Sequence, residues 1–151
     1  MSYSIDANIL LYASNTQAPE HSKAIAFMNN RPRDMDLMCL TWPALMAYQR
    51  IATHPAIFEQ PFSPAEAWQN VANLLALPRA RVLAEEDGFS EIYQDVTHGL
   101  SVRGNLVPDA HIAALLRQHG VDRIYTSDSD FRKFAFLDVI NPLSKNYTGQ
   151  P

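Results

Sequence analysis

The amino-acid sequence predicts an α/β fold, in which helices cover both faces of a mostly parallel sheet. Two observations predict this class. Short apolar runs alternate with longer segments of helical periodicity, and capping residues, glycines or prolines separate the two kinds of segment. Strands that are separated by helices favour parallel pairing with helices on both sides of the sheet. We therefore expect a three-layer α/β/α arrangement.

The first half of the chain is expected to contain two strands and their helices. A short strand over residues 3–6 leads directly into the apolar segment 9–12, and a helix with one broad apolar face follows over residues 19–29. Residues 37–41 form a buried strand. A Trp-Pro pair then starts a helix over about residues 42–53, and a His-Pro pair ends it, because the residue before proline avoids the helical conformation.

Ser63 marks the clearest helix start in the second half. It is a good N-cap residue, proline follows at the first helical position, and Glu66 completes a capping box. Gly120 is expected to end a later helix in the left-handed conformation. The expected elements are a helix to about residue 77, an edge strand over 79–83, helices over 86–98 and 108–120, and short strands over 124–126 and 139–140.

Size and charge place the chain among ordinary globular domains. Its 151 residues suit one domain with a substantial core, and 47% of them are apolar while 19% are charged. The formal net charge of -4 gives no global basic field that would indicate a nucleic-acid partner. A cation bound among acidic residues would remove part of this negative charge, so a phosphate-containing substrate stays compatible with the composition.

Several features favour the cytoplasm. Cys39 is the only cysteine, which permits no intrachain disulfide and fits a reducing compartment. The sequence enters a strand directly, without the pattern of a signal peptide. No apolar stretch approaches the roughly 20 residues that span a bilayer. We therefore expect a cytoplasmic protein without a membrane partner.

Four aspartates are the strongest functional signal. Asp6, Asp109, Asp128 and Asp130 each lie at the exit of a short apolar run or in the first turn of a helix. The carboxyl ends of parallel strands share one edge of the sheet, where binding sites form in open α/β folds. Clustered carboxylates raise one another's pKa unless a hard divalent cation neutralises them. The pattern therefore indicates a Mg²⁺ or Mn²⁺ site.

Each aspartate also has a purely structural explanation. Asp6 can cap the turn after the first strand, Asp109 gains roughly 0.3–1 kcal/mol from the helix dipole, and Asp128 and Asp130 can form Asx turns. The joint pattern is harder to explain in this way. Asp6 lies between Ile5 and Ile9, and several carboxylates at such partly buried positions are costly without a counter-charge.

Four segments also carry a family resemblance. In chain order they are Ile5-Asp-Ala-Asn-Ile-Leu10, Trp42-Pro43 with residues 50–55, residues 104–116, and Thr126-Ser-Asp-Ser-Asp-Phe131. Together they resemble PIN-domain ribonucleases, specifically the VapC toxins of prokaryotic toxin–antitoxin pairs, over about residues 3–143. The resemblance implies a PIN-like nuclease domain over residues 1–143, and residues 144–151 are expected to form a flexible C-terminal tail.

The resemblance implies a function and a site. It implies a Mg²⁺-dependent endoribonuclease, with Mn²⁺ as a possible substitute, that acts on RNA. Asp6, Asp109 and Asp128 are the implied metal ligands, and Asp130 contributes to the same catalytic pocket. Asn8, Thr126 and Ser127 are candidates for orienting these ligands. His111 is two positions from Asp109 on a helix and faces another side, so a packing or surface role is favoured.

The resemblance also implies a cognate VapB-like antitoxin and a homodimer. In toxins of this kind, an apolar segment of the antitoxin lies in a groove of the toxin. A basic side chain of the antitoxin often reaches into the acidic pocket. Large apolar side chains over residues 42–62 exceed what a small sheet needs, so we expect some of them to remain exposed and to line that groove.

One position departs from the family pattern. Ala47 stands where most PIN domains carry a glutamate, which removes one carboxylate from the metal environment and leaves the number of ions open. Positive charge for RNA is limited to Arg103, Arg132 and Lys133, which flank the acidic motifs, and Arg50 near Ala47. Arg132 and Lys133 fit a solvated turn as well as an RNA contact. Two other functions therefore stay open: a catalytically weak PIN-like module that binds RNA or a partner without cutting, and a hydrolase of small phosphoesters.

Overall fold

A parallel sheet of five strands lies at the centre of the structure, a computed structural model that describes residues 1–149. The strands are β1 (Ser2–Ile5), β2 (Leu37–Thr41), β3 (Ala80–Leu83), β4 (Arg123–Tyr125) and β5 (Asp138–Ile140). Their order across the sheet is β3-β2-β1-β4-β5, and each neighbouring pair is parallel. The predicted α/β class is therefore confirmed.

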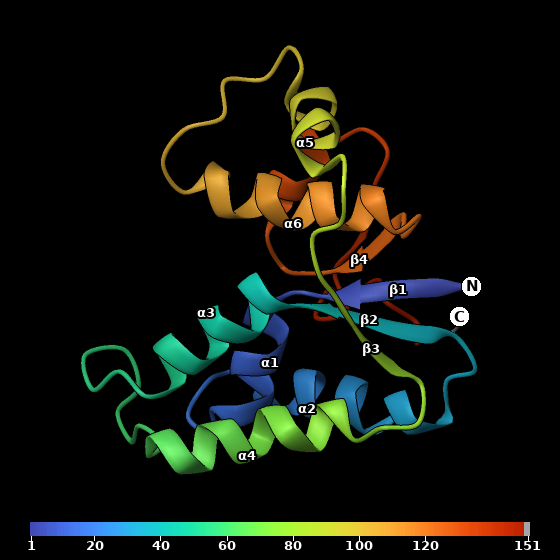
Figure 1. Ribbon diagram of the computed structural model, residues 1–151. Coiled ribbons are helices and arrows are strands. Elements are labelled where there is room, and N and C mark those ends of the chain that lie inside the picture. Colours follow the sequence, from blue (N-terminus) through green and yellow to red (C-terminus); the bar gives the residue numbers. More distant parts are fainter. Residues whose placement is uncertain (150–151) are drawn as a thin grey trace.

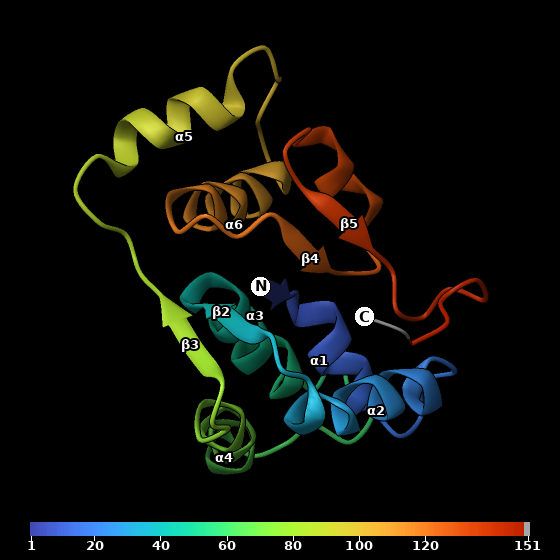
Figure 2. The same cartoon turned by 90° about the vertical axis from the view of Figure 1, so that its right-hand side faces the viewer.

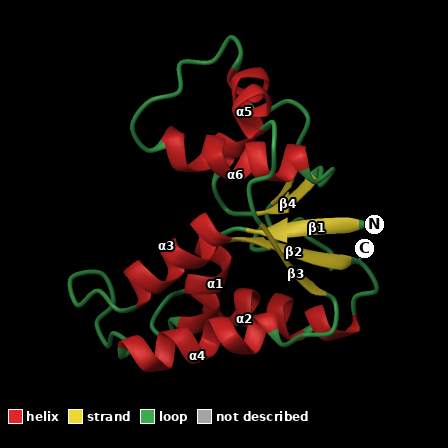
Figure 3. Cartoon of the chain, viewed as in Figure 1, coloured by secondary structure: helices red, strands yellow, loops and turns green. Residues whose placement is uncertain are grey.

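Helices cover both faces of this sheet (Figures 1 and 3). The α-helices are α1 (Ala7–Ser14), α2 (His21–Asn29), α3 (Trp42–Ala52), α4 (Pro64–Leu75), α5 (Phe89–Thr97) and α6 (Leu106–Gln118), and the 3-10 helices are η1 (Arg31–Arg33) and η2 (Ser129–Lys133). Helices α1 to α4 pack on one face and α6 on the other, so that two apolar clusters enclose the sheet as predicted.

Helix α5 makes no direct layer on the sheet. Figure 2 shows α6 between α5 and the strands. No residue of α5 is fully buried, although Phe89, Tyr93 and Val96 follow a helical spacing that faces α6. Helix α5 is therefore a peripheral element that depends on α6 for its only apolar face.

The strand order reverses direction between β1 and β4. From β1 the chain builds outward through β2 and β3, and it later returns to the other side of β1 with β4 and β5. Ser4 of β1 pairs with Ile124 of β4, which fixes these two central strands in register. A crevice opens at such a reversal beyond the carboxyl ends of the strands, and side chains that follow β1 and β4 meet there.

Most predicted boundaries hold within a few residues, with two instructive differences. Helix α6 begins at Leu106 rather than at Pro108, so Asp109 still lies in its first turn. Helix α5 begins at Phe89 rather than at residue 86, because Gly88 adopts φ 86° at its start. Neither 3-10 helix was predicted, and η2 begins where the Asp128 side chain accepts a hydrogen bond from the Asp130 N–H.

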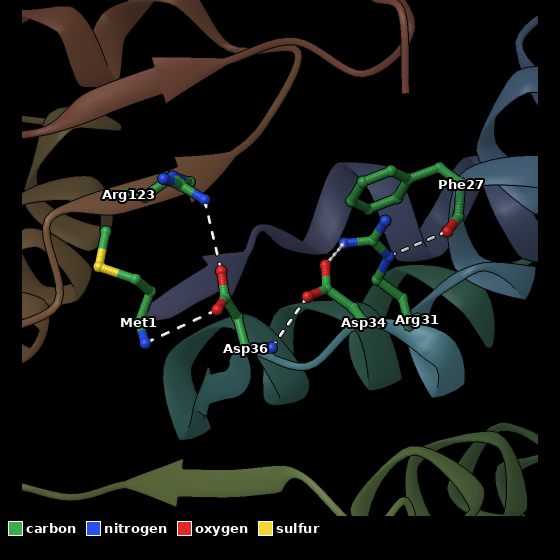
Figure 4. A network of polar contacts seen from close by, with 6 residues as sticks. All are labelled: Met1, Phe27, Arg31, Asp34, Asp36 and Arg123. Atoms are coloured by element: carbon green, nitrogen blue, oxygen red, sulfur yellow. Dashed lines mark hydrogen bonds and ion pairs between the residues drawn. The ribbon is translucent and has the colours of Figure 1, made fainter. Parts of the chain in front are cut away.

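Ion pairs fix the opposite, amino-terminal edge of the sheet (Figure 4). The Asp36 carboxylate, just before β2, lies 3.6 Å from the amino terminus of Met1 and 3.7 Å from the Arg123 guanidinium of β4. Beside it, buried Arg31 donates to the Phe27 carbonyl at 3.0 Å and to Asp34 at 3.1 Å. Three strand starts are thereby tied together, away from the strand exits.

The segment expected to form a flexible tail begins with packed residues. The Tyr147 ring lies 6.1 Å from the ring of Phe27 and 6.4 Å from that of Tyr125, measured between centroids. The boundary at residue 143 stays a prediction, and residues 150–151 of the expected tail lie outside the described residues. Over residues 1–149, no helix combines the length and apolar character that crossing a membrane requires.

Candidate metal centre

Three carboxylates converge at the reversal between β1 and β4. Asp128 follows β4, Asp130 belongs to η2, and Asp109 reaches the same place from the first turn of α6. One carboxylate oxygen of each lies within 4.8 Å of those of the other two. We call these three residues the acidic trio. Their convergence follows from the topology, because α6 leads into β4 and returns the chain to the same crevice.

Asp6 lies next to the trio in a more buried position. It follows β1, is 9% exposed, and accepts hydrogen bonds from the Ala7 N–H at 2.7 Å and from the Thr126 hydroxyl at 2.8 Å. Burial raises the pKa of Asp6 above its ordinary value, and the Asp128 carboxylate adds to the increase, whereas the two hydrogen bonds oppose it. Asp6 thus shares its electrostatic environment with the trio.

Thr126 connects the ends of β1 and β4. Its buried hydroxyl donates to Asp6 and accepts from the Asn8 side-chain amide at 3.1 Å and from the Asp128 N–H at 2.9 Å. A hydroxyl offers one donor and two acceptor sites, and all three are used here. The Ser127 N–H donates in turn to Asn8 Oδ1 at 3.4 Å. A single hydroxyl thus holds the side chain of Asp6 and the backbone of Asp128.

Asp109 carries the clearest sign of electrostatic crowding. Its pKa is raised to about 7, chiefly by burial and then by the carboxylates of Asp128, Asp6 and Asp130, while the ammonium of Lys133 opposes the increase. This carboxyl is therefore close to half protonated at neutral pH when no cation is present. Crowded carboxylates of this kind gain most from a divalent cation, which removes their mutual repulsion.

Asp130 lies at the solvent-exposed rim of the site. Its carboxylate pairs with the ammonium of Lys133 at 3.2 Å, and both side chains are about half exposed. From the sequence, Asp130 was expected to contribute to the pocket, and Lys133 could not be distinguished from a solvated turn residue. The sequence signal for this ion pair is the three-residue spacing of Asp130 and Lys133, which brings the two side chains together in a short helix.

The donor set fits Mg²⁺ or Mn²⁺. It consists of carboxylate oxygens alone, which these hard cations prefer, whereas nitrogen and sulfur ligands would favour zinc or copper. Oxygens bound to one Mg²⁺ lie up to about 4.2 Å apart, so the trio needs only small side-chain rotations or a bridging water to share an ion.

Other residues considered from the sequence lie outside this cluster. His111 contacts the Glu85 carboxylate and the Phe89 ring, at 5.7 Å between ring centroids, and so ties α6 to the segment after β3. Ala47 packs in the apolar cluster beside α6, where the missing glutamate would have stood. The side chains of Arg50, Arg103 and Arg132 are exposed.

Comparison with known proteins agrees with this architecture. Residues 3–137 match the model of the PIN domain family. Ribonuclease VapC48 of Mycobacterium tuberculosis is 36% identical over 144 residues, which cover 95% of this chain and 99% of that protein. Ribonuclease VapC37 of the same species is 33% identical over 130 residues, covering 86% and 90%.

Solved structures share the fold at much lower identity. The Mycobacterium tuberculosis toxin VapC20, described as cleaving the sarcin-ricin loop, superposes with a TM-score of 0.66 at 16% identity, over 92% of this chain and 99% of that one. VapBC2 from Rickettsia felis, bound to a DNA fragment from its promoter, gives a TM-score of 0.64 at 15% identity, over 92% and 97%. These similarities extend the agreement from sequence to three-dimensional arrangement.

Proposed function

The chain belongs to the PIN domain family, within its VapC ribonucleases, and on this premise we propose that it is a metal-dependent endoribonuclease, the toxin of a VapBC-type toxin–antitoxin pair. The observation that carries the proposal is the acidic trio, with Asp6 beside it, at the reversal of the sheet. A cluster of four carboxylates has no packing value of its own and disfavours the metal-free fold. A bound cation would offset this unfavourable free energy, so a role in metal binding accounts for the cluster.

We propose Mg²⁺ as the cofactor, with Mn²⁺ as a substitute. Asp6, Asp109 and Asp128 would hold the ion, and Asp130 would contribute to the same pocket. When bound, such a cation lowers the pKa of a coordinated water and offsets negative charge on the phosphate group. These are the two requirements for hydrolysing a phosphodiester bond, and no other arrangement in the crevice supplies them.

The remaining work falls to the protein's own side chains. The Thr126 hydroxyl and the Asn8 amide hold Asp6 and the Asp128 backbone in fixed positions, so that little reorganisation is needed when the cation binds. The Asp109 carboxyl holds a proton part of the time in the metal-free site and releases it as the ligand charge is neutralised. Metal binding is therefore expected to be tighter at higher pH.

A direct assay tests the proposal. Purified protein should cleave a structured RNA in Mg²⁺ or Mn²⁺, and EDTA should abolish the cleavage. An Asp6→Asn variant that cleaves as well as the wild type would indicate a contaminating nuclease and would remove the main support. The runner-up function, a PIN-like module that binds without cutting, is motivated by Ala47 at the glutamate position; RNA binding without cleavage in either metal would favour it.

Thermal melting gives a test that needs no substrate. A ligand that binds only the native state stabilises it by about 2.7 kcal/mol at a hundredfold excess over its dissociation constant. Millimolar Mn²⁺ should therefore raise the wild-type melting temperature by several degrees and should have much less effect on Asp109→Ala. A wild-type melting temperature that does not respond to Mn²⁺ would count against the metal site even if cleavage were observed.

We infer that a VapB-like antitoxin is the partner. An apolar groove of about 360 Å³ lies between α1, α2 and α4 and fits the apolar segment of such an antitoxin. Tyr48 and Phe62, from the region predicted to line a groove, lie in its wall. Leu45 and Phe58 from the same region are instead buried: Leu45 of α3 belongs to the core cluster on the sheet, and Phe58, in the loop after α3, packs with its ring 6.3 Å from that of Phe62.

A further inference from the structure

A second cavity lies on the α6 side of the sheet, close to the acidic trio but separate from it. Its volume is about 360 Å³, and it is formed by the end of α5, the last turn of α6 and the chain around the end of η2. Figure 2 shows these three segments on the same side of the sheet. The side chains that decide its chemistry are those of Asp95, His98, Leu100, Arg117, Lys133 and Phe136. We call it the Arg117 cavity.

The wall of this cavity is cationic, in contrast to the protein as a whole. Arg117 and Lys133 carry positive charges and His98 adds an imidazole, whereas Asp95 is the one carboxylate of the lining. The lining thus carries two positive charges against one negative charge, whereas the chain has a formal net charge of -4.

Arg117 is held in place but keeps its hydrogen-bonding capacity. Its guanidinium lies over the ring of Phe136, 5.1 Å from the centroid. Within residues 1–149, Arg117 forms no ion pair with a carboxylate, unlike Arg31 and Arg123. Stacking on an aromatic ring fixes the plane of a guanidinium and leaves its N–H groups free, and this planar fork matches two oxygens of a phosphate group.

Lys133 connects the cavity with the acidic trio. Lys133 is one of the residues that line the cavity, and its ammonium lies 3.2 Å from the Asp130 carboxylate. A divalent cation on the trio would compete with Lys133 for Asp130, and the ammonium would then be available on the cavity side.

We propose that the Arg117 cavity is an anion subsite that holds a backbone phosphate of the RNA strand, one or more nucleotides away from the phosphate at the acidic trio. Arg117 donates to the oxygens of this phosphate, and Lys133 lies between the two phosphates. Eight residues separate Arg117 from Asp109 on α6, a distance of about 12 Å along the helix axis. The subsite is thus too far from the trio to serve the phosphate that is cleaved.

The subsite rests on the proposed ribonuclease function, which requires an RNA strand to bind beside a cluster of carboxylates. The trio repels RNA when it holds no cation, so the strand needs a positive contact nearby. Apolar side chains of the lining, Val96, Leu100 and Phe136, offer contact area for a ribose or base without selecting a sequence. The subsite therefore supplies affinity and orientation for the strand rather than recognition of particular bases.

Salt-dependent RNA binding tests the subsite separately from catalysis. A short fluorescein-labelled single-stranded RNA is titrated with the full chain in EDTA, which prevents cleavage, and the dissociation constant is measured by anisotropy over a range of NaCl concentrations. Arg117→Met keeps the aliphatic contact with Phe136 but loses the charge. It should weaken binding several-fold at low salt and reduce the slope of log K against log salt by about 0.7, the value for one phosphate contact on a single strand.

Three variants complete the design. Arg117→Lys should retain the slope, because it retains the charge. Asp95→Asn removes the opposing carboxylate of the lining and should strengthen RNA binding at low salt. Arg81→Met serves as the matched control, because Arg81 is also exposed and forms no ion pair within residues 1–149, but lies on β3 at the opposite edge of the sheet. It should leave the slope unchanged.

The outcomes separate the subsite from the proposed function. Equal slopes for the wild type and Arg117→Met would overturn the subsite, while RNA cleavage by the wild type would leave the ribonuclease function intact. Absence of both RNA binding and cleavage in the wild type would overturn the function itself. A melting temperature that rises with inorganic phosphate, together with an unchanged RNA slope, would overturn the subsite in favour of a site for free phosphate. If Arg117→Met unfolds at a lower temperature than the wild type, the RNA affinity of Asp95→Asn tests the subsite instead. Stronger binding than in the wild type at low salt supports the subsite, and equal binding overturns it.

Discussion

At the residue scale, Asp109 determines how the metal-free protein responds to pH. Its pKa is raised to about 7 in the folded state by burial and by three neighbouring carboxylates, against about 3.9 in an unfolded chain. Between these values the folded state holds a proton that the unfolded state has released. The free energy of unfolding therefore falls as pH rises from about 4 to 7, and the loss is complete above pH 7.

An Asp109→Asn variant should remove this pH dependence. We expect metal-free wild type to lose on the order of 2 kcal/mol across the window, after allowing for solvent screening of a half-buried carboxyl, and the variant to lose clearly less. Urea denaturation in EDTA at several pH values measures the free energy of unfolding of the wild type and of Asp109→Asn. Asp122→Asn is the control, because Asp122 is an exposed carboxylate between α6 and β4. Parallel pH profiles for wild type and Asp109→Asn would contradict the prediction.

Thr126 offers a second prediction at this scale. Thr126→Val keeps the shape of the side chain and removes the hydroxyl, so that Asp6 Oδ2, the Asn8 side-chain N–H and the Asp128 N–H lose the hydrogen bonds that they make with it, while Asp6 keeps only the bond from the Ala7 N–H. Leaving a buried polar group unpaired costs about 1–3 kcal/mol, so the variant should unfold at lower urea and bind Mn²⁺ more weakly. Thr126→Ser retains the hydroxyl and should lose much less of either. Unchanged Mn²⁺ affinity in Thr126→Val would show that the network does not position the ligands.

At this scale the sequence predicted which side chains meet but not how they are arranged. Asp6, Asp109 and Asp128 could be grouped because each follows a strand or opens a helix, and the parallel topology brings such positions together. Asp130 was expected in the same pocket, but the approach of its carboxylate to within 4.8 Å of Asp109 and Asp128 depends on the 3-10 geometry of η2, which was not predicted. The pairing of Lys133 with Asp130 depends on the same turn.

At the scale of elements, local signals were reliable where the backbone alone decides the outcome. The capping box of Ser63 and Glu66 is present at the start of α4, as predicted. Gly120 adopts φ 70°, the left-handed conformation expected after α6. The position of α5 outside the helix layer that covers the sheet was not predictable. Its amphipathic pattern does not indicate whether its apolar face packs on α6 or on the sheet.

Gly120 allows this agreement to be tested. No atom lies within 4 Å of the position that a Cβ would occupy, so Gly120→Ala meets no steric obstacle and its cost is conformational. An L-residue in the left-handed region costs roughly 1–2 kcal/mol, and asparagine less, so Gly120→Ala should be more destabilised than Gly120→Asn. Urea denaturation gives both values. RNA cleavage per folded molecule should be unchanged, and a large loss of activity in a folded variant would contradict a purely structural role.

At the scale of the whole molecule, the predicted family and layer arrangement are confirmed, and assembly is where sequence alone had least to say. Large apolar side chains over residues 42–62 were expected to exceed the needs of the core. Leu45, Tyr48 and Phe58 are buried, and Ile51 and Phe62 are partly buried. Trp42, Met46 and Ile57 remain exposed, as expected. Trp42 and Met46 lie on one face of α3, whereas Ile57 lies in the loop after it.

That face predicts a homodimer. Trp42 and Met46 are one turn apart on α3 and are 39% and 44% exposed. Two large apolar side chains at adjacent exposed positions favour a two-fold contact, in which the same patch meets itself and both copies are covered at once. Light scattering of the wild type at micromolar concentration should give about twice the chain mass of 17.0 kDa. A stable mass near that of one chain would exclude the dimer.

The double variant Trp42→Glu with Met46→Glu places two like charges on each side of the two-fold contact and should give the mass of one chain. Its melting temperature at low protein concentration should change little, because neither side chain belongs to the core of one domain. Trp68→Glu controls for added charge on an exposed aromatic position, since Trp68 is 45% exposed on α4, and it should remain dimeric. Dissociation by Trp68→Glu alone would place the contact on α4 instead of α3.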